Sequence, residues 1–93
     1  MLQIIPTKQF KKDLKRIAKD SKKDLNKLYK TINILAEKRQ LPVEYRDHQL
    51  KGNLKHFREC HIEPDWLLIY QIKNDVLVLS LVRTGSHSDL LNM

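Results

Sequence analysis

Two short turns in the second half of the chain place the strongest constraint on its fold. Glu63-Pro64-Asp65 and Lys73-Asn74-Asp75 separate three stretches rich in apolar residues, at about 55–62, 67–72 and 76–83. Parallel neighbouring strands need a crossover of a dozen or more residues, and these connections have only three. The three stretches therefore predict an antiparallel meander.

The first half of the chain has the apolar spacing of helices. Residues 2–5 predict a short strand, and Thr7 is a candidate N-cap for the helix that follows. Ser21 followed by Asp24 resembles a capping box for a second helix that runs to about Arg39. One-sided apolar stripes predict that the two helices form a hairpin over a shared surface. The stripes are Phe10, Leu14, Ile17 and Ala18, then Leu25, Leu28, Tyr29, Ile32, Leu35 and Ala36.

The remaining segments complete the predicted architecture. The stretch 76–83 is apolar at nearly every position, which predicts a central strand buried on both faces. Residues 41–52 are expected to form a loop, and Ser86 with Asp89 resembles the start of a short helix. The fold class is α+β, with the order β-α-α-β-β-β and an antiparallel sheet covered on one face by the helical hairpin. We expect a single domain over residues 1–93, and its terminal helix carries His87, Leu90 and Leu91.

Charge is distributed unevenly along the chain. Residues 1–40 hold 12 Lys and Arg against 4 Asp and Glu, a net charge of +8, whereas residues 41–93 hold 6 against 7, a net charge of −1. The total of +7 indicates a polyanion or an acidic protein as partner. The alternative interpretation is a solvated, lysine-rich helix face.

Cysteine content and hydropathy favour a cytoplasmic protein. The single cysteine, Cys60, cannot form an internal disulfide, so an oxidising compartment is not needed. The longest apolar run, Val76–Leu79, is far shorter than the ~20 residues that span a bilayer. The N-terminal residues lack the basic and apolar regions of a signal peptide. We therefore expect no membrane association.

Histidines are the main candidates for chemistry, because metal and nucleotide motifs are absent from the sequence and no cofactor is expected. His61 ends a predicted strand beside the turn that holds Asp65, a partner that suits a general base or acid. The alternative is a rim histidine that hydrogen-bonds its own turn. His48 lies in the 41–52 loop, His87 follows Ser86 at a predicted helix start, and His56 is interpreted as a surface residue.

Two further side chains suit an RNA substrate. Arg83 closes the most apolar strand, where its guanidinium fork can hold a phosphate or pair with a carboxylate. Trp66 is either a platform for a nucleobase or a core anchor under the helices. Cys60 and His61 are adjacent on a strand and so face opposite ways, which disfavours a Cys–His pair. Histidines, an aspartate, an arginine and an aromatic without a metal set are typical of metal-free RNA cleavage.

Three motifs carry a resemblance to a known family. They are Asp47-His48-Gln49-Leu50-Lys51-Gly52, His61-Ile62-Glu63-Pro64-Asp65-Trp66 and Arg83-Thr84-Gly85-Ser86-His87. With the chain length and the element order, they resemble the YafQ-type toxins of the RelE/ParE superfamily of bacterial toxin–antitoxin systems. The resemblance covers nearly the whole chain. It implies a RelE-like fold and a ribosome-dependent mRNA endonuclease that acts in the ribosomal A site and is neutralised by a cognate antitoxin.

The resemblance also implies roles for individual residues. Catalysis would fall to His48, His61 and His87 with Asp65, where His87 is the general acid and His48 or His61, oriented by Asp65, is the base. Arg83 would bind phosphate, and Trp66 would be the aromatic platform, because Leu90-Leu91 stands where such toxins often carry an aromatic residue. Lysines of the helices would contact ribosomal RNA. These are Lys11, Lys12, Lys15, Lys19, Lys22 and Lys23.

Other functions remain open on sequence alone. The same superfamily contains toxins without the histidines that inhibit DNA gyrase. A non-catalytic domain that binds RNA or protein is a further alternative, in which the histidines are rim polar groups. A weaker option is a metal site made by His48, His61, Asp65 and His87, which are admissible ligands.

Overall fold

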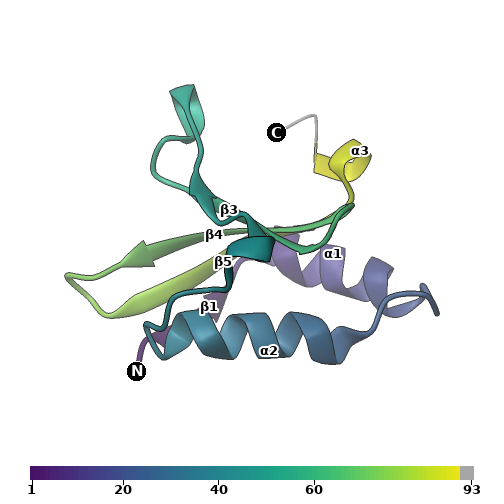
Figure 1. Ribbon diagram of the computed structural model, residues 1–93, viewed down its shortest axis with the longest axis horizontal. Coiled ribbons are helices and arrows are strands. Elements are labelled where there is room, and N and C mark those ends of the chain that lie inside the picture. The colour runs from purple at the N-terminus through teal and green to yellow at the C-terminus, as the bar shows by residue number, and fades with distance from the viewer. Residues whose placement is uncertain (91–93) are drawn as a thin grey trace.

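A computed structural model describes residues 1–90 and has two layers, a five-stranded sheet and a pair of helices on one of its faces. Figure 1 shows α1 and α2 on one side of the sheet, and the 3-10 turn η2 and the short helix α3 on the other. Leu91 lies outside the described residues. The elements are β1 Gln3–Pro6, α1 Lys8–Ala18, α2 Leu25–Ala36, η1 Val43–Tyr45, β2 His48–Gln49, η2 Gly52–Leu54, β3 Arg58–Glu63, β4 Trp66–Lys73, β5 Val78–Gly85 and α3 His87–Leu90.

The sheet has the strand order β1-β5-β4-β3-β2. The pairs β3–β4 and β4–β5 are antiparallel, which confirms the meander. The first strand differs from the expected antiparallel sheet, because β1 pairs with β5 in parallel, and Gln3 lies opposite Val78. The chain reaches this position through the two helices, which supply the crossover that a parallel pair requires.

Burial corrects the prediction for the central strand. β4 is buried from Trp66 to Tyr70, whereas β5 alternates between buried and partly exposed positions. β4 lies in the middle of the sheet and has core side chains on both faces, and β5 lies between β4 and the short edge strand β1. The loop expected over residues 41–52 also contains more structure, namely η1 and the two-residue strand β2.

The helices begin at side-chain caps. Oγ1 of Thr7 accepts a hydrogen bond from the backbone N–H of Phe10 at 3.0 Å, which confirms the predicted cap of α1. The second cap is Asp24 and not Ser21, because the Asp24 carboxylate accepts from the N–H of Asn26 at 2.9 Å. α2 then ends at Ala36, earlier than predicted. Among residues 1–90, no helix combines the length and the apolar character needed to cross a membrane.

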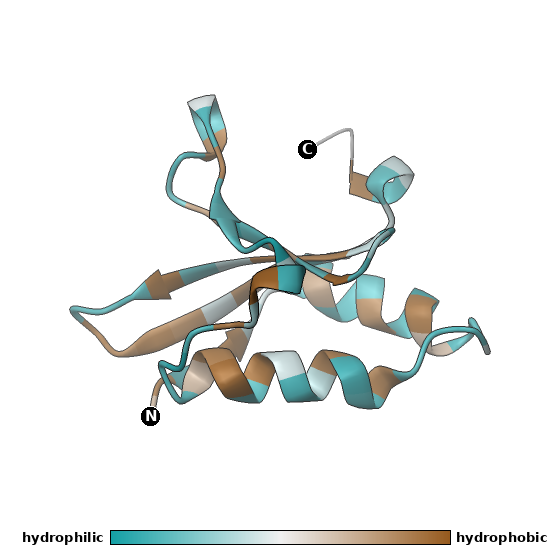
Figure 2. Cartoon of the chain, in the orientation of Figure 1, coloured by the Kyte–Doolittle hydropathy of each residue, from teal (hydrophilic) through white to brown (hydrophobic). Residues whose placement is uncertain are grey.

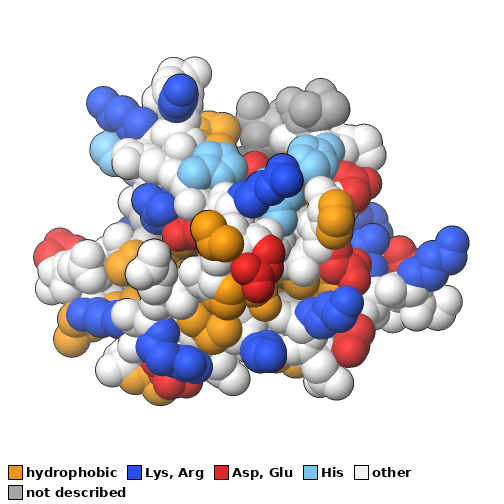
Figure 3. All heavy atoms as spheres, viewed as in Figure 1, with side chains coloured by type: hydrophobic (Ala, Val, Ile, Leu, Met, Phe, Trp, Pro, Cys, Tyr) orange, Lys and Arg blue, Asp and Glu red, His pale blue; other side chains and the backbone are white. Residues whose placement is uncertain are grey.

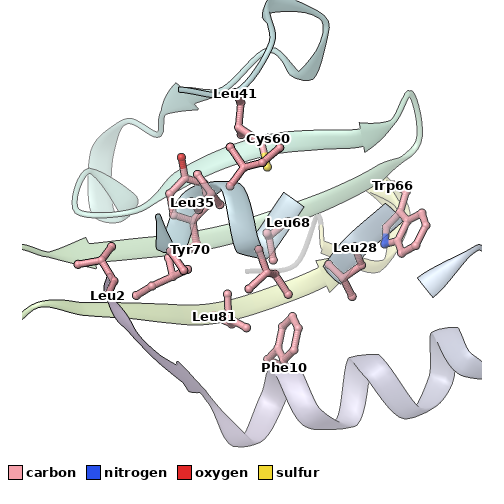
Figure 4. Close-up of a cluster of buried hydrophobic side chains, with 14 of the residues drawn as sticks. Leu2, Phe10, Leu28, Leu35, Leu41, Cys60, Trp66, Leu68, Tyr70 and Leu81 are labelled. Carbon is pink, nitrogen blue, oxygen red and sulfur yellow. The ribbon is translucent and has the colours of Figure 1, made fainter. Parts of the chain in front are cut away.

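The main core lies between the helices and the sheet. Brown apolar segments of both helices face the strands in Figure 2, and Figure 4 shows the side chains that meet there. Trp66 and Tyr70 of β4 are its largest fully buried members, with Leu28 of α2 between the layers. A second, smaller cluster lies on the opposite face of the sheet. It consists of Leu67, Ile69 and Leu90, with Leu50, Phe57 and Val82 packed against it.

Candidate active site

Three imidazole rings form a row on the face of the sheet away from the helices. His61 lies in the middle, with ring centroids 6.4 Å from His48 and 5.7 Å from His87. Strand register explains why His48 and His61 share a face. Glu59 and His61 are two residues apart on β3 and therefore point the same way. Each paired residue lies on the face of its partner, so His48, opposite Glu59, and Leu67 of the second cluster, opposite His61, lie on this face too. Figure 3 shows histidines gathered on this side of the molecule around a Lys or Arg side chain.

His87 is held by Asp65 at the start of α3. Oδ1 of Asp65 accepts the backbone N–H of His87 at 2.9 Å and lies 2.6 Å from its Nδ1. These two hydrogen bonds hold the pKa of Asp65 below its usual value. The predicted pairing of Asp65 with His61 is therefore wrong. Asp65 lies in the turn before β4, and its carboxylate reaches the first residue of α3. Within the described residues, the second ring nitrogen of His87, Nε2, has no hydrogen-bond partner.

His48 lies between two acceptors. Its Nδ1 is 2.7 Å from the carbonyl oxygen of Arg46, so Nδ1 carries the proton and donates to that carbonyl. Its Nε2 is 3.7 Å from a carboxylate oxygen of Glu59, the residue opposite it in the β2–β3 register. Glu59 could not be identified from the sequence, because β2 has only two residues and its register with β3 cannot be read from spacing.

His61 has an unusual environment. Its Nδ1 is buried and has no hydrogen-bond partner within the described residues. The residue also lines a cavity of about 580 Å³ between α2, η1 and the end of β3. The charged residues of this cavity have mixed signs, because Lys27, Lys30 and the exposed Arg46 line it together with Glu44 and Glu63. Lys27 is paired with Glu63 at 2.7 Å. Arg46 was not among the site residues predicted from the sequence.

The guanidinium of Arg83 is occupied by a carboxylate, which corrects its expected role as a phosphate ligand. Its Nε and one Nη donate to the two carboxylate oxygens of Asp13 at 2.9 and 3.1 Å. Asp13 is fully buried in α1 and also accepts the backbone N–H of Thr84. Burial alone would raise the pKa of Asp13, but the hydrogen bonds from Arg83 and Thr84 outweigh it and lower that pKa. The guanidinium is thus part of the seam between α1 and β5.

Comparison with known proteins identifies the family of this chain. A family model described as "Bacterial toxin of type II toxin-antitoxin system, YafQ" matches residues 2–92. The chain belongs to the YafQ family. It is 41% identical over 83 residues to the mRNA interferase toxin YafQ of Escherichia coli K12, which covers 88% of this chain and 87% of that protein.

Solved structures of YafQ-family and related toxins share the fold. A metal-bound toxin from Helicobacter pylori is 53% identical, with a TM-score of 0.90 over 97% of this chain and 99% of that one. The E. coli DinJ–YafQ complex gives 38% identity and a TM-score of 0.86 over 97% and 98%. The predicted α+β fold class and the resemblance to YafQ-type toxins are confirmed. The curated YafQ relative is by its name an mRNA interferase, that is, an endoribonuclease.

Trp66 is a core residue in this YafQ-family chain and not a platform for a base. Its side chain is 1% exposed, and its Nε1 donates to Oγ1 of Thr84 at 3.0 Å. It lies under the helices because β4 is central and its even-numbered residues face the main core. Lys23 covers the ring, with its Nζ 5.9 Å from the centroid. Of the two roles predicted for Trp66, the core anchor is correct.

Cys60 and His56 lie where expected. Cys60 is buried in the main core, on the opposite face of β3 from His61, and burial raises the pKa of its thiol. His56 is exposed, and so are five of the six lysines named as RNA-binding candidates. The exception is Lys23, which is partly buried and forms an ion pair with Asp20.

The residues that the structure describes do not fit a metal centre. Within 1–90, no group of three or more His, Cys, Asp and Glu side chains has the placement of a ligand set.

Proposed function

We propose that this chain is a toxin that cleaves mRNA on the ribosome, with the three-histidine row as its acid–base machinery. The observation that carries the proposal is the row itself, whose end rings are each held through Nδ1, His48 by a carbonyl and His87 by Asp65. Such anchoring fixes the tautomer and aims Nε2 at the substrate. The name of the E. coli relative supports mRNA as the substrate class.

His48 is the base and His87 is the acid in this proposal. With Nδ1 protonated, His48 carries a lone pair on Nε2 and takes the proton of the ribose 2′-hydroxyl, while Glu59 stabilises the imidazolium that forms. The 2′-oxygen then bonds to phosphorus and the P–O5′ bond breaks. His87 enters protonated, stabilised by Asp65, and gives its Nε2 proton to the leaving 5′-oxygen.

The middle of the row faces the phosphate. His61, between the other two rings, donates to a non-bridging oxygen as negative charge develops there. The cation expected of Arg83 is supplied instead by Arg46, which is exposed and lines the cavity that His61 also lines. Lys30 on the same cavity extends positive charge along the path of the RNA backbone.

Exposed lysines supply affinity for the ribosome. Lys11, Lys12 and Lys15 project from α1 to solvent, on the helix side of the molecule. Phosphate contacts of this kind do not depend on sequence and weaken with salt. In this arrangement the helices contact ribosomal RNA while the opposite face receives mRNA in the A site, so the toxin acts in the cytoplasm. Lys19 and Lys22 are exposed beside them.

The test is a reconstituted translation reaction in which mRNA cleavage is mapped by primer extension. The wild-type chain is expected to cut within the A-site codon, and His87→Ala and His61→Ala to abolish cutting. His56→Ala is the matched control, since His56 is exposed outside the row. Cleavage that survives His87→Ala and His61→Ala would refute the site. Inhibition of gyrase supercoiling without mRNA cleavage would refute the nuclease proposal.

We also propose that a cognate antitoxin covers the helical face. The E. coli relative is solved in complex with DinJ. In this chain an apolar cavity of about 530 Å³ lies between β1, α1 and α2, with Tyr29 exposed on it and Lys11 at its rim. Apolar lining with a basic rim suits an acidic amphipathic segment. Tyr29→Glu is expected to weaken the complex in calorimetry, and Val76→Glu, at an exposed residue that does not line the cavity, to leave it unchanged.

A further inference from the structure

A second pocket opens beside the histidines, on the face of the sheet that carries α3. It has a volume of about 110 Å³ and lies between η2 and α3. Its polar lining residues are Glu59 and His87, which both belong to the histidine site. The rest of its wall is aliphatic, from Leu50, Leu54, Leu67, Ile69 and Leu90.

The chemistry of this wall matches a nucleobase. A base has two apolar faces and a polar edge, so it binds where aliphatic side chains flank a small number of polar groups. The pocket adjoins His87, which is proposed to protonate the leaving oxygen, so an occupant is within one nucleotide of the scissile phosphate. A carboxylate is otherwise an unexpected lining for a pocket with mainly aliphatic walls.

Glu59 gives the pocket a preference among bases. The Glu59 side chain is 17% exposed, and an ionised carboxylate only accepts hydrogen bonds. Adenine, cytosine and guanine each carry an exocyclic amino group that can donate to it. Uracil has no amino group, and its one ring N–H lies between two carbonyl oxygens, so a carboxylate that accepts from this N–H is also approached by an acceptor oxygen that it repels.

We propose that this pocket binds the base next to the scissile phosphate and that Glu59 selects amino-bearing bases over uracil. This inference rests on the proposed function, because it takes the histidine row as the place of the phosphate. Discrimination of this kind is on the order of tenfold for one well-placed polar contact. Leu50, Leu54 and Leu90 supply affinity for all four bases and no selectivity.

The test uses binding rather than cleavage. Protein with labelled leucine and isoleucine methyl groups is titrated with 3′-AMP, 3′-CMP and 3′-UMP, and inorganic phosphate is the reference. We expect AMP and CMP to shift the methyl signals of Leu50, Leu54 and Leu90 and to bind about tenfold more tightly than UMP. Phosphate alone is expected to move the histidine signals and leave the leucine methyl groups unchanged.

Two variants separate the parts of the proposal. Glu59→Gln is expected to erase the preference, because an amide can donate to the uracil carbonyl as well as accept. Leu54→Ala is expected to weaken binding of all three nucleotides several-fold, whereas Val76→Ala, a truncation on the exposed β4–β5 turn, is expected to change nothing.

Three results would overturn the inference. They are nucleotide binding that leaves the leucine methyl groups unmoved, equal affinity of the wild-type protein for UMP and AMP, and no binding of any nucleotide at millimolar concentration. Failure of the proposed function gives a different result from failure of this inference. If the chain binds AMP in this pocket but leaves mRNA intact, the pocket is supported and the nuclease proposal is refuted.

Discussion

Asp65 and His87 are joined twice through one oxygen atom, because Oδ1 of Asp65 contacts both the backbone N–H and the ring Nδ1 of His87. Asp65 belongs to the turn before β4 and His87 begins α3, so the carboxylate ties two parts of the chain 22 residues apart. One side chain thus sets both the position of α3 and the orientation of the proposed general acid.

Asp65→Asn tests this relationship. The amide keeps the size of the side chain but removes the charge that stabilises protonated His87. We expect the single-turnover cleavage rate to fall at least tenfold while the concentration for half-maximal rate changes little, and His87→Ala to cost about 10²–10⁴-fold. Asp75→Asn, in the exposed turn between β4 and β5, is the control. Equal rates for Asp65→Asn and wild type would remove Asp65 from the mechanism.

The buried pair of Asp13 and Arg83 is expected to dominate the electrostatic stability of the fold. Asp13→Ala leaves the Arg83 guanidinium, itself 19% exposed, without its carboxylate. Loss of one partner of a buried ion pair costs about 3–5 kcal/mol in the free energy of unfolding, measured by urea denaturation. Asp20→Ala breaks the partly exposed pair with Lys23 and is expected to cost much less than Asp13→Ala. Similar costs for the two variants would contradict this assignment.

The same pair makes stability depend on pH in a defined direction. Since the folded pKa of Asp13 is lowered, its contribution is complete above the unfolded pKa of about 3.9 and is lost as pH falls through the folded value. Urea midpoints of the wild type are therefore expected to drop in this acid range. Asp13→Ala is expected to show a smaller drop over the same range.

Trp66→Phe distinguishes a core residue from a base platform. The smaller ring loses packing and the hydrogen bond to Thr84, so we expect a loss of about 1–3 kcal/mol in unfolding free energy. Circular dichroism is the suitable probe, because the variant removes the single tryptophan of the chain. RNA affinity of the folded variant is expected to equal that of the wild type. A selective loss of RNA affinity at unchanged stability would restore the platform role.

Tyr70→Phe probes how His48 is positioned. The Tyr70 hydroxyl donates to Asp47, the residue before His48, and Arg58 donates to the same carboxylate. Burial and this hydrogen bond raise the pKa of Tyr70, so the hydroxyl stays protonated. We expect the variant to lose about 1 kcal/mol of stability and to shift the imidazole signals of His48. Tyr29→Phe, exposed on α2, is the control.

Local features of the fold could be predicted from the sequence, and long-range side-chain partners could not. Turn spacing identified the meander, and apolar periodicity identified both helices, because each depends on residues close in the chain. Asp13 interacts with Arg83 and Thr84, 70 and 71 residues away, so no residue near it in the sequence indicates its partners.

Prediction of the candidate site had the same limit, since contacts between residues far apart in the chain could not be predicted. Three histidines were predicted to share a site and do lie in one row. His61 and His87 lie at the ends of predictable elements, whereas His48, in the expected loop, was assigned to the site by the family resemblance. The partner of Asp65 was mistaken because His61 is nearer in sequence, whereas the fold brings α3 to the same turn. Glu59 and Arg46 were missed because their contacts with His48 depend on β2 and η1, elements too short to leave a periodic signal.

Pairing of β1 with β5 has a consequence for synthesis of the chain. Residues 3–6 have their strand partners at 78–81, and Thr7 donates to the carbonyl of Val82. At about 5–20 residues per second, the first strand waits roughly 4–15 s on the ribosome before its partner is made. A chain that stops before residue 78 thus lacks both the partner of its first strand and His87, so it can form neither the parallel strand pair nor the proposed acid–base site.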